Sequence, residues 1–340
     1  MSINPVEIPT GAVRYNTDSN KMEVYIGSTW MEVATSSPNL DGGTRGLFVG
    51  GWRNSPSTAR SNGIDFITIS TTGDATDFGD LSTVLRAHAS FADRTRGLNA
   101  AGGNPSVTNT IEFITISSTG NSQNFGDLTV ARDYLAGINN ATRGVAGGAW
   151  GPSRSDVIDF VTMQSTGNAV DFGNLLTAKQ TDGSFSSPTR GFWVGGASGS
   201  SPDYDASTSG TVINFITTSS TGNAQDFGDL INGTYAKVGA SNSIRGLAAG
   251  GYGSPANIVA IVLIIMATLG NSIDFGDMSN AHYYGAGTSD KTRAIFGGGS
   301  PATNVIEYVN IATDGDSVDF GDLTQARQTP AGLSNANGGL

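Results

Sequence analysis

Six stretches of the chain share a pattern in which apolar and polar residues alternate around a central aromatic or aliphatic position. The first two are "IDFITIS" at 64–70 and "IEFITIS" at 111–117. A period of two residues is typical of a strand that buries one face. The other four stretches occupy 158–164, 213–219, 261–267 and 306–312. The run "IVAIVLIIM" at 258–266, which overlaps the fifth stretch, is apolar throughout. This favours a fully buried strand, and the run is too short for a helix that crosses a bilayer.

Two further marks recur with each stretch. After it comes a turn such as "STGN" and then Phe-Gly followed by Asp or Asn; before it come an Arg and a glycine pair. The phenylalanines are Phe78, Phe125, Phe172, Phe227, Phe275 and Phe320, with spacings of 47, 47, 55, 48 and 45 residues. The arginines are Arg45, Arg96, Arg143, Arg190, Arg245 and Arg293. A period of 40–50 residues indicates a propeller or another repeat array.

Each unit therefore holds four expected strands, which is the content of one propeller blade. Blades hide their edges by packing around a ring, so the pattern predicts an all-β, six-bladed β-propeller over residues 39–340. The segment "TQARQTPAGLS" at 324–334 is the strand type that the first unit lacks. We expect this C-terminal strand to pair into the first blade and close the ring. Each recurring Phe is expected to fill the seam between two blades, and the Gly beside it to allow close backbone approach.

Composition agrees with short strands and many turns, and it excludes some function classes. The chain has 48 Gly, only 14% charged residues, a net charge of −11, two His and no Cys. A negative chain repels nucleic acid and anionic lipid, so we expect neither nucleic-acid binding nor membrane insertion. Disulfides and thiolate metal sites are excluded, and "MSINPVEIPTGAV" lacks the features of a signal peptide.

The recurring charged residues have a structural and a functional interpretation. The residues after Phe-Gly could ligate calcium, but capping of the turns is favoured because a ligand set needs oxygens that converge on one point. They are Asp80, Asp127, Asn174, Asp229, Asp277 and Asp322. The recurring arginines are expected to pair with acids of the alternating strands. Those acids are Asp65, Glu112, Asp159 and Glu307.

The order of these marks resembles the kelch repeat over residues 43–334. A strand ends in Gly-Gly, a middle strand follows, and "FGDL" stands where kelch usually has a Trp-based word. Arg132, Lys179 and Arg327 stand near the position of the kelch arginine. The fifth unit departs most, with Val262 at the acidic position. The resemblance implies a kelch-like propeller.

Residues 1–38 do not follow the period. "GAVRYNTDSNKMEVYIGSTWMEVAT" at 11–35 predicts three strands separated by two turns. Its expected apolar face consists of Val13, Tyr15, Met22, Val24, Tyr25, Trp30 and Val33. A sheet this small is marginal alone and needs a partner surface.

This N-terminal segment resembles segments near the ends of bacteriophage tail-fibre and other virion proteins. The Phe-Gly-Asp-Leu repeats look like those of structural proteins of marine phages, especially cyanophages. Together the resemblances imply a virion component, located in a tail fibre or surface appendage, that attaches to other virion proteins through residues 1–38. They also suggest a homo-oligomer, and a trimer because fibres are commonly trimeric.

No arrangement typical of catalysis is present. There is no Ser-His-Asp order, no His set at metal-ligand spacing and no phosphate loop, and His88 and His282 are expected to be packing residues. A carboxylate pair for glycoside cleavage is selected only by geometry. We therefore expect no enzyme activity, no cofactor and no metal.

Aromatic residues mark a candidate binding face. The connections after the Gly-Gly strand and after the Phe-Gly strand should emerge at the same end of the blades, where the units differ most in length. The candidates are Trp52, Trp150, Tyr204, Tyr252, Tyr235, Tyr283 and Tyr284. Aromatic rings among Asn, Ser and Asp suit stacking on sugars or anchoring a protein contact.

Three functions remain open from the sequence. The first is a virion protein whose propeller face binds a glycan or protein on the host surface. The second is a capsid, neck or tail decoration protein that docks only to other virion proteins. The third and weakest is a glycan-degrading enzyme.

Overall fold

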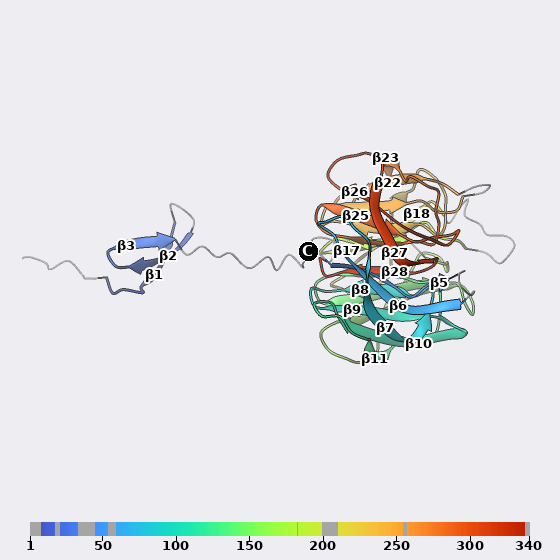
Figure 1. The fold of residues 1–340 in the computed structure, drawn as a ribbon, viewed down its shortest axis with the longest axis horizontal. Coiled ribbons are helices and arrows are strands. Elements are labelled where there is room, and N and C mark those ends of the chain that lie inside the picture. Colours follow the sequence, from blue (N-terminus) through green and yellow to red (C-terminus); the bar gives the residue numbers. More distant parts are fainter. Residues whose placement is uncertain are drawn as a thin grey trace, which may run out of the picture. The chain divides into compact units, whose positions relative to one another are not determined.

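The computed structural model describes residues 8–17, 21–32, 45–53, 59–181, 183–198, 210–253 and 257–336. These residues form 28 strands and no helix. Figure 1 shows the fold as a ribbon. Among the described residues there is accordingly no helix that is long and apolar enough to cross a membrane. The chain divides into two compact units, Met1–Leu40 and Asp41–Leu340. The sequence places this boundary at residue 38.

The N-terminal unit is one antiparallel sheet. It consists of β1 (Val13–Asn16), β2 (Lys21–Ile26) and β3 (Thr29–Glu32), in that order. Val13, Val24 and Met31 are paired in register and share a face, while Tyr25 is paired with Trp30 on the other face. The single apolar face predicted from the sequence is therefore wrong for Tyr25 and Trp30, because consecutive residues of a strand point to opposite sides. Val33 lies outside the described residues.

The larger unit contains six antiparallel sheets among its described residues. Sheet 1 consists of β28 (Ala331–Ser334), β4 (Arg45–Val49), β6 (Ala59–Thr68), β5 (Trp52–Arg53) and β7 (Thr76–Leu85). Sheet 2 consists of β8 (Ala89–Ala92), β9 (Arg96–Asn104), β10 (Ser106–Thr115) and β11 (Gln123–Asp127). Sheet 3 consists of β12 (Ala136–Asn139), β13 (Arg143–Ala149), β14 (Ser155–Thr162) and β15 (Val170–Asn174).

The other three sheets repeat the four-stranded order. Sheet 4 consists of β16 (Gly183–Ser186), β17 (Arg190–Val194), β18 (Val212–Thr217) and β19 (Gln225–Asp229). Sheet 5 consists of β20 (Val238–Ser241), β21 (Arg245–Ala249), β22 (Ala260–Ile265) and β23 (Ile273–Asp277). Sheet 6 consists of β24 (Ala286–Ser289), β25 (Arg293–Gly297), β26 (Thr303–Asn310) and β27 (Val318–Arg327).

The first strands of these sheets form a closed ring. In the order β8, β12, β16, β20, β24 and β28, each strand contacts the next, and β28 contacts β8. The ring is closed by the two ends of the unit, because β28 pairs with β4 through Ala331 opposite Val49 and Ser334 opposite Gly46. The predicted pairing of the C-terminal strand with the first Gly-Gly strand is confirmed.

Glycines allow the inner strands to approach closely. A Cβ placed on Gly239 would lie 2.1 Å from the carbonyl oxygen of Ser184, and one on Gly287 would lie 2.0 Å from the carbonyl oxygen of Gly239. Gly332 occupies the same place against Gly287. No side chain fits there, so glycine at this position brings the backbones of neighbouring sheets into contact.

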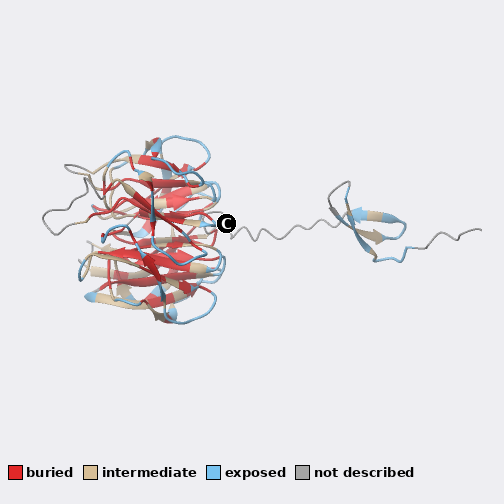
Figure 2. Cartoon of the chain, turned by 180° about the vertical axis from the view of Figure 1, so that it is seen from behind, coloured by how far each residue is buried: buried red, intermediate tan, exposed pale blue. Residues whose placement is uncertain are grey.

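Apolar side chains are buried between the sheets, and the recurring Phe lies among them. Figure 2 shows that the buried residues lie along the strands of this unit. Phe78 packs with Leu47 and Ile64 of its own sheet and with Ile114 of sheet 2. The six recurring phenylalanines are 2% or 3% exposed. Each Phe therefore lies in an interior between two sheets, which is the environment that the repeat predicts.

The Phe-Gly word and the Thr-Gly-Asn turn bind each other across every seam. At the first seam, the amide of Gly120 donates to the carbonyl of Phe78 at 2.8 Å, and the amide of Ser122 donates to the carbonyl of Asp80 at 2.9 Å. The amide of Asp80 donates to Oδ1 of Asn121 at 3.0 Å. The same side-chain bond recurs for Asp127 and Asn168, Asn174 and Asn223, Asp229 and Asn271, Asp277 and Asp316, and Asp322 and Asp74. We call this set of bonds the seam clasp.

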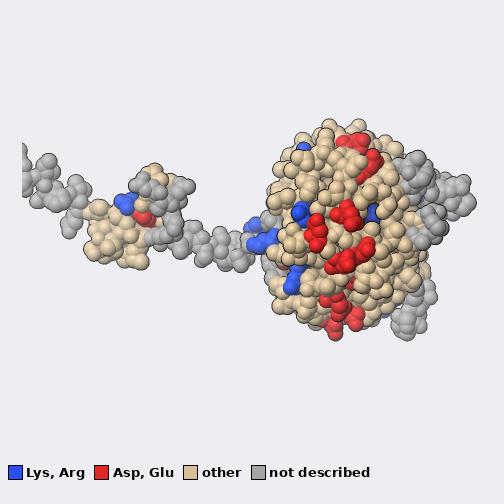
Figure 3. Space-filling model, turned by 90° about the horizontal axis from the view of Figure 1, so that it is seen from above, with Lys and Arg blue, Asp and Glu red and all other residues tan. Residues whose placement is uncertain are grey.

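The seam clasp corrects one prediction. The residue after Phe-Gly contributes its backbone amide, and the capping side chain comes from the turn of the neighbouring sheet instead. Side chains such as those of Asp80 and Asp229 are exposed. Figure 3 shows the acidic side chains as a row of patches on the side in view. Exposed charges on outer strands oppose the pairing of one sheet edge with another.

The recurring arginines also differ from the prediction. Arg45 Nη1 donates to the carbonyl of Ile116 in the next sheet at 2.8 Å, and its guanidinium lies 5.1 Å from the ring of Phe66. The predicted pairing with Asp65 is wrong because Arg45 is paired with Thr68, whereas Asp65 is paired with Phe48 farther along the strand. The other five arginines donate to the equivalent backbone carbonyls of Met163, Thr218, Met266, Ile311 and Ile69.

Buried charges come from Arg132, Lys179 and Arg327 rather than from the recurring arginines. Arg132 binds Asp159 at 3.0 Å, and Arg327 binds Asp65 at 2.5 Å. Lys179 Nζ donates to the carbonyl of Gly195 at 2.6 Å, and burial lowers the pKa of this amine to about 8. Lys237 Nζ donates to the carbonyl of Gly250 in the same way, at 2.8 Å. The seams thus share an apolar interior but differ in their polar groups, with an Arg–Asp pair at two seams and a buried lysine at two others.

Candidate functional site

Two sets of connections meet at one end of the ring. The bridge between Tyr235 and Tyr252 ties the connection that precedes an inner strand to the loop that follows a Gly-Gly strand. Trp52 is bridged to Gln328, and Tyr283 to Ser300, in the same way. The predicted candidates of both sets therefore lie at the same end.

The backbone at the start of the inner strands is held by bonds between neighbouring sheets. Tyr134 donates its amide to the carbonyl of Ala87 at 2.7 Å, and Thr329 donates to the carbonyl of Tyr284 at 2.7 Å. Five residues at this position have positive φ: Ala87 at 51°, Tyr134 at 52°, Ala236 at 60°, Tyr284 at 57° and Thr329 at 53°. Residues other than glycine rarely adopt this backbone conformation, so the hydrogen bonds between neighbouring sheets must hold it.

The aromatic residues at this end form a continuous network, which we call the aromatic mouth. Its members are Trp52, Tyr134, Trp150, Tyr235, Tyr252, Tyr283 and Tyr284. The ring centroids are 6.1 Å apart for Trp150 and Tyr134, 5.4 Å for Tyr134 and Tyr284, and 5.2 Å for Tyr284 and Tyr283. Tyr283 continues to Tyr252 at 5.5 Å, and Tyr252 to Tyr235 at 5.2 Å. All seven are partly exposed.

Tyr134 and Tyr284 come from opposite sides of the ring. Tyr134 precedes β12 and Tyr284 precedes β24, and these strands are three steps apart in the ring order. Gln180 Nε2 donates to the hydroxyl of Tyr284 at 3.0 Å. The two tyrosines therefore meet over the axis of the ring and cover the central channel at this end.

A cavity of about 290 Å³ lies beside these tyrosines. Its lining combines Trp52 and Arg86 with Tyr134, Tyr283 and Tyr284, and it is completed by Gln328 and Thr329. The Arg86 guanidinium carbon lies 5.6 Å from the ring of Trp52 and 5.3 Å from that of Tyr134, and Arg86 Nη1 donates to the Tyr134 hydroxyl at 2.6 Å. Arg86 thus links Trp52 to the rest of the aromatic mouth.

Six of the seven predicted binding residues lie in the aromatic mouth, and Tyr204 lies outside the described residues. Tyr134 and Arg86 are not among the candidates predicted from the sequence. Both could have been found from the register, because Asp133-Tyr134 and Arg86-Ala87 occupy the same place in the repeat as Tyr283-Tyr284.

One carboxylate lies next to the cavity. Asp133 accepts from the amide of Gly151 at 3.0 Å, and its Oδ2 is 4.0 Å from Arg86 Nη2. Burial raises the pKa of Asp133, and Arg86 and Arg60 oppose this effect. The carboxylate is thus held between the backbone amide of Gly151 and the Arg86 guanidinium.

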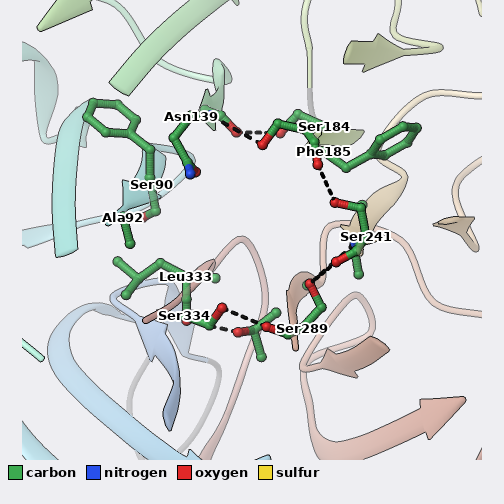
Figure 4. A pocket seen from close by; sticks show the side chains of 17 residues that line it. Ser90, Ala92, Asn139, Ser184, Phe185, Ser241, Ser289, Leu333 and Ser334 are labelled. Atoms are coloured by element: carbon green, nitrogen blue, oxygen red, sulfur yellow. Dashed lines mark hydrogen bonds between the residues drawn. The ribbon is translucent and has the colours of Figure 1, made fainter. Parts of the chain in front are cut away.

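The other end of the central channel is lined by hydroxyl groups. Figure 4 shows Ser241, Ser289 and Ser334 around this end, where each donates to a backbone carbonyl of the preceding inner strand, at 2.8, 2.7 and 2.6 Å. The two cavities along the channel have volumes of about 70 and 90 Å³. These volumes suit a few water molecules rather than a sugar or cofactor.

A metal site needs several ligating side chains that converge on one point. In the described part of the chain, no group of three or more His, Cys, Asp or Glu side chains could hold a metal ion. His88 is 4% exposed, and burial lowers its pKa to about 4. His88 is therefore a neutral interior residue at physiological pH.

Comparison with solved structures identifies the architecture. The structure of YjhT matches with a TM-score of 0.60 and 10% sequence identity, over 73% of this chain and 87% of that chain. The larger unit is a β-propeller. No family model matches the sequence, and no curated protein matches it. At this identity the likeness shows only the fold, and propellers include enzymes as well as binding proteins.

Proposed function

We propose that the chain is a structural protein of a bacteriophage particle, of tail-fibre or appendage type, that binds a host-surface receptor through the aromatic mouth of a six-bladed, kelch-like propeller. The six sheets and the closed ring of inner strands support the blade number. The repeat words and the N-terminal segment support the virion origin by resemblance.

The observation that carries the binding proposal is the aromatic mouth. Partly exposed rings adjoin a cavity of about 290 Å³, and backbone bridges between loops fix the residues that carry them. Rigid aromatic rings provide contact area at a low cost in conformational entropy. They also stack on the apolar faces of sugar rings, so a surface glycan is the receptor that this geometry suits best.

A binding role is favoured over catalysis. None of the seven residues that line the cavity carries a carboxylate, and glycoside hydrolysis usually needs two carboxyl groups across the scissile bond. A glycan-degrading enzyme remains the weaker alternative. The release of reducing ends from a bound polysaccharide would support it.

The N-terminal sheet has the surface of an attachment and oligomerisation module. One face presents Val13 at 58%, Tyr15 at 54%, Met22 at 44%, Ile26 at 52% and Met31 at 53% exposure. At about 100 Å² from each side chain, two copies facing each other would bury roughly 1,000 Å², the lower limit for a specific interface. We therefore assign this face to a second copy of the chain, and the unit as a whole to anchoring in the particle.

The receptor proposal can be tested with the full-length protein on an array of bacterial surface polysaccharides. Tyr284→Ala and Trp52→Ala should each lower the affinity for a bound polysaccharide by at least about tenfold, as expected for central aromatic anchors. Leu269→Ala, an exposed apolar residue in the turn between β22 and β23 of the propeller, is the matched control and should bind normally.

The decoration alternative predicts a different result. If no polysaccharide and no bacterial cell binds, while the protein still enters particles, the aromatic mouth contacts another virion protein. Tyr284→Ala should then reduce incorporation into particles, which the receptor proposal does not predict.

A further inference from the structure

Positive charge is concentrated beside the aromatic mouth of a protein whose net charge is −11. Arg86 is the only charged residue among the seven that line the cavity. Arg60 lies behind Trp52, with its guanidinium carbon 5.3 Å from that ring. Arg154 lies 3.8 Å from the ring of Trp150. Three arginines therefore stack on aromatic mouth residues.

The donors of two of these arginines are not used up by the protein. The Nε atoms of Arg60 and Arg86 are shielded from solvent and have no hydrogen-bond partner in the described structure. A shielded donor without a partner costs free energy, so the protein does not neutralise these guanidinium groups fully. The Arg86 side chain is 23% exposed and lines the cavity, so an acceptor bound there can reach its guanidinium. An anionic acceptor gives the stronger bond, because charge-assisted bonds are roughly twice as strong as neutral ones.

The nearby acid does not cancel this charge. Among the described residues, Asp133 is the carboxylate that pairs with Arg86, and their 4.0 Å separation is at the limit of an ion pair. Burial raises the pKa of Asp133, and two arginines, Arg86 and Arg60, both lower it. The exposed aspartates of the outer strands are screened, because fields in water at physiological salt fade over about 8 Å.

We propose that the aromatic mouth takes an acidic saccharide, with a sugar ring stacked on its aromatic residues and the carboxylate or sulfate group of that sugar bound by Arg86, while Arg60 behind Trp52 adds positive charge to the site. This inference rests on the receptor function proposed above. The guanidinium fork suits both oxyanions, which share the geometry of two oxygens on one centre. The neutral rings and the arginines thus recognise different parts of one ligand.

The test uses calorimetric titration of the full chain with three hexasaccharides: a neutral galactan, a sulfated galactan and an oligogalacturonate. At least one charged hexasaccharide should bind about tenfold or more tightly than the neutral one, and added salt should weaken only the charged ligand. Binding of the sulfated but not the carboxylated sugar, or the reverse, identifies the oxyanion.

Variants separate the charge from the shape of the site. Arg86→Gln should lower the affinity for the charged hexasaccharide by roughly 10- to 100-fold, Arg86→Lys should lower it less, and neither should change neutral binding more than about twofold. Arg60→Gln keeps the test informative if Arg86→Gln does not fold. Arg94→Gln, in the exposed turn between β8 and β9, is the matched control and should behave as wild type.

The outcomes distinguish the two proposals. Equal binding of neutral and charged sugars, wild-type affinity in both Arg86→Gln and Arg60→Gln, or no binding of any hexasaccharide would overturn the acidic-saccharide inference. The receptor function would then still be decided separately, by whether surface polysaccharides or cells bind through Tyr284 and Trp52.

Discussion

The seam that closes the propeller contains a buried ion pair whose removal gives a measurable prediction. Asp65 binds Arg327 at 2.5 Å and accepts from Thr324, through the amide at 3.0 Å and the hydroxyl at 2.8 Å. The two charged side chains are 2% and 1% exposed. Arg327 also donates to the carbonyls of Gly50 and Gly63, both at 3.1 Å. One guanidinium thus joins the start and the end of the ring.

Asp65→Ala leaves this guanidinium buried without its counter-ion. The loss of one partner of a buried pair costs about 3–5 kcal/mol, and the two unsatisfied donors of Thr324 place the expected loss in the upper part of that range. The double variant Asp65→Val with Arg327→Met removes both charges together. It should lose less than Asp65→Ala, because buried pairs can be replaced by apolar residues at little cost. At the seam of sheets 4 and 5, Val262 stands at the acidic position and the buried Lys237 binds the carbonyl of Gly250 at 2.8 Å in place of an ion pair.

Urea unfolding of the four members of the cycle measures this coupling. The expected coupling between positions 65 and 327 is at least about 1.5 kcal/mol, as found for residues in one polar network. A parallel cycle at Arg132 and Asp159 serves as the control, since that pair lies between sheets that the chain connects directly. Additive effects of Asp65→Val and Arg327→Met would refute the argument that the pair acts as one buried unit.

Three further predictions concern the propeller. Gly287→Ala should destabilise it by at least about 2 kcal/mol in urea unfolding, because the added Cβ would lie 2.0 Å from the Gly239 carbonyl oxygen. Ser184→Ala, at the same position of another repeat, should cost less than about 1 kcal/mol. Equal losses would contradict the packing argument. Asn168→Ala should cost about 1 kcal/mol, because it removes the side-chain bond of one seam clasp. Asn168→Asp should be tolerated, because two other seams have aspartate at this position. If Asn168→Asp lowers the thermal unfolding temperature more than Asn168→Ala, the side-chain bond does not stabilise the seam. The pKa of His88 is about 4 in the folded protein and 6.5 in the unfolded chain, so the unfolded state binds the proton first as the pH falls. The free energy of unfolding should therefore be highest above pH 6.5 and fall by up to roughly 3 kcal/mol as the pH drops toward 4. Unfolding measured across this range should depend less on pH in His88→Leu.

Much of the fold could be predicted because each repeat carries the same local patterns of burial and turning. The alternating stretches, the glycine pairs and the Phe-Gly words each report a local need: a buried face, a tight turn or a close approach. The strand order and the closure by residues 331–334 follow from their sequence order alone. The partners of the recurring polar groups did not follow, since a bond between sheets depends on how neighbouring units are staggered. Arg45 and Asp80 were therefore assigned to the wrong partners.

The candidate site was predicted in part for the same reason. The sequence indicates that Tyr252 and Tyr283 emerge at one end, because strand direction fixes which end a loop occupies. It does not indicate that Tyr134 reaches Tyr284 across the axis, since these residues are far apart in the chain and meet only when the ring closes.

The sequence by itself determined the all-β class, the period of the units and the strand that joins the two ends, because these depend on local patterns of burial and turning. Only the tertiary structure decided which side chains meet: the seam clasp, the buried pair of Asp65 and Arg327, and Arg86 between Trp52 and Tyr134. Such contacts depend on the angle and stagger between sheets, and the packing of the whole ring sets these quantities.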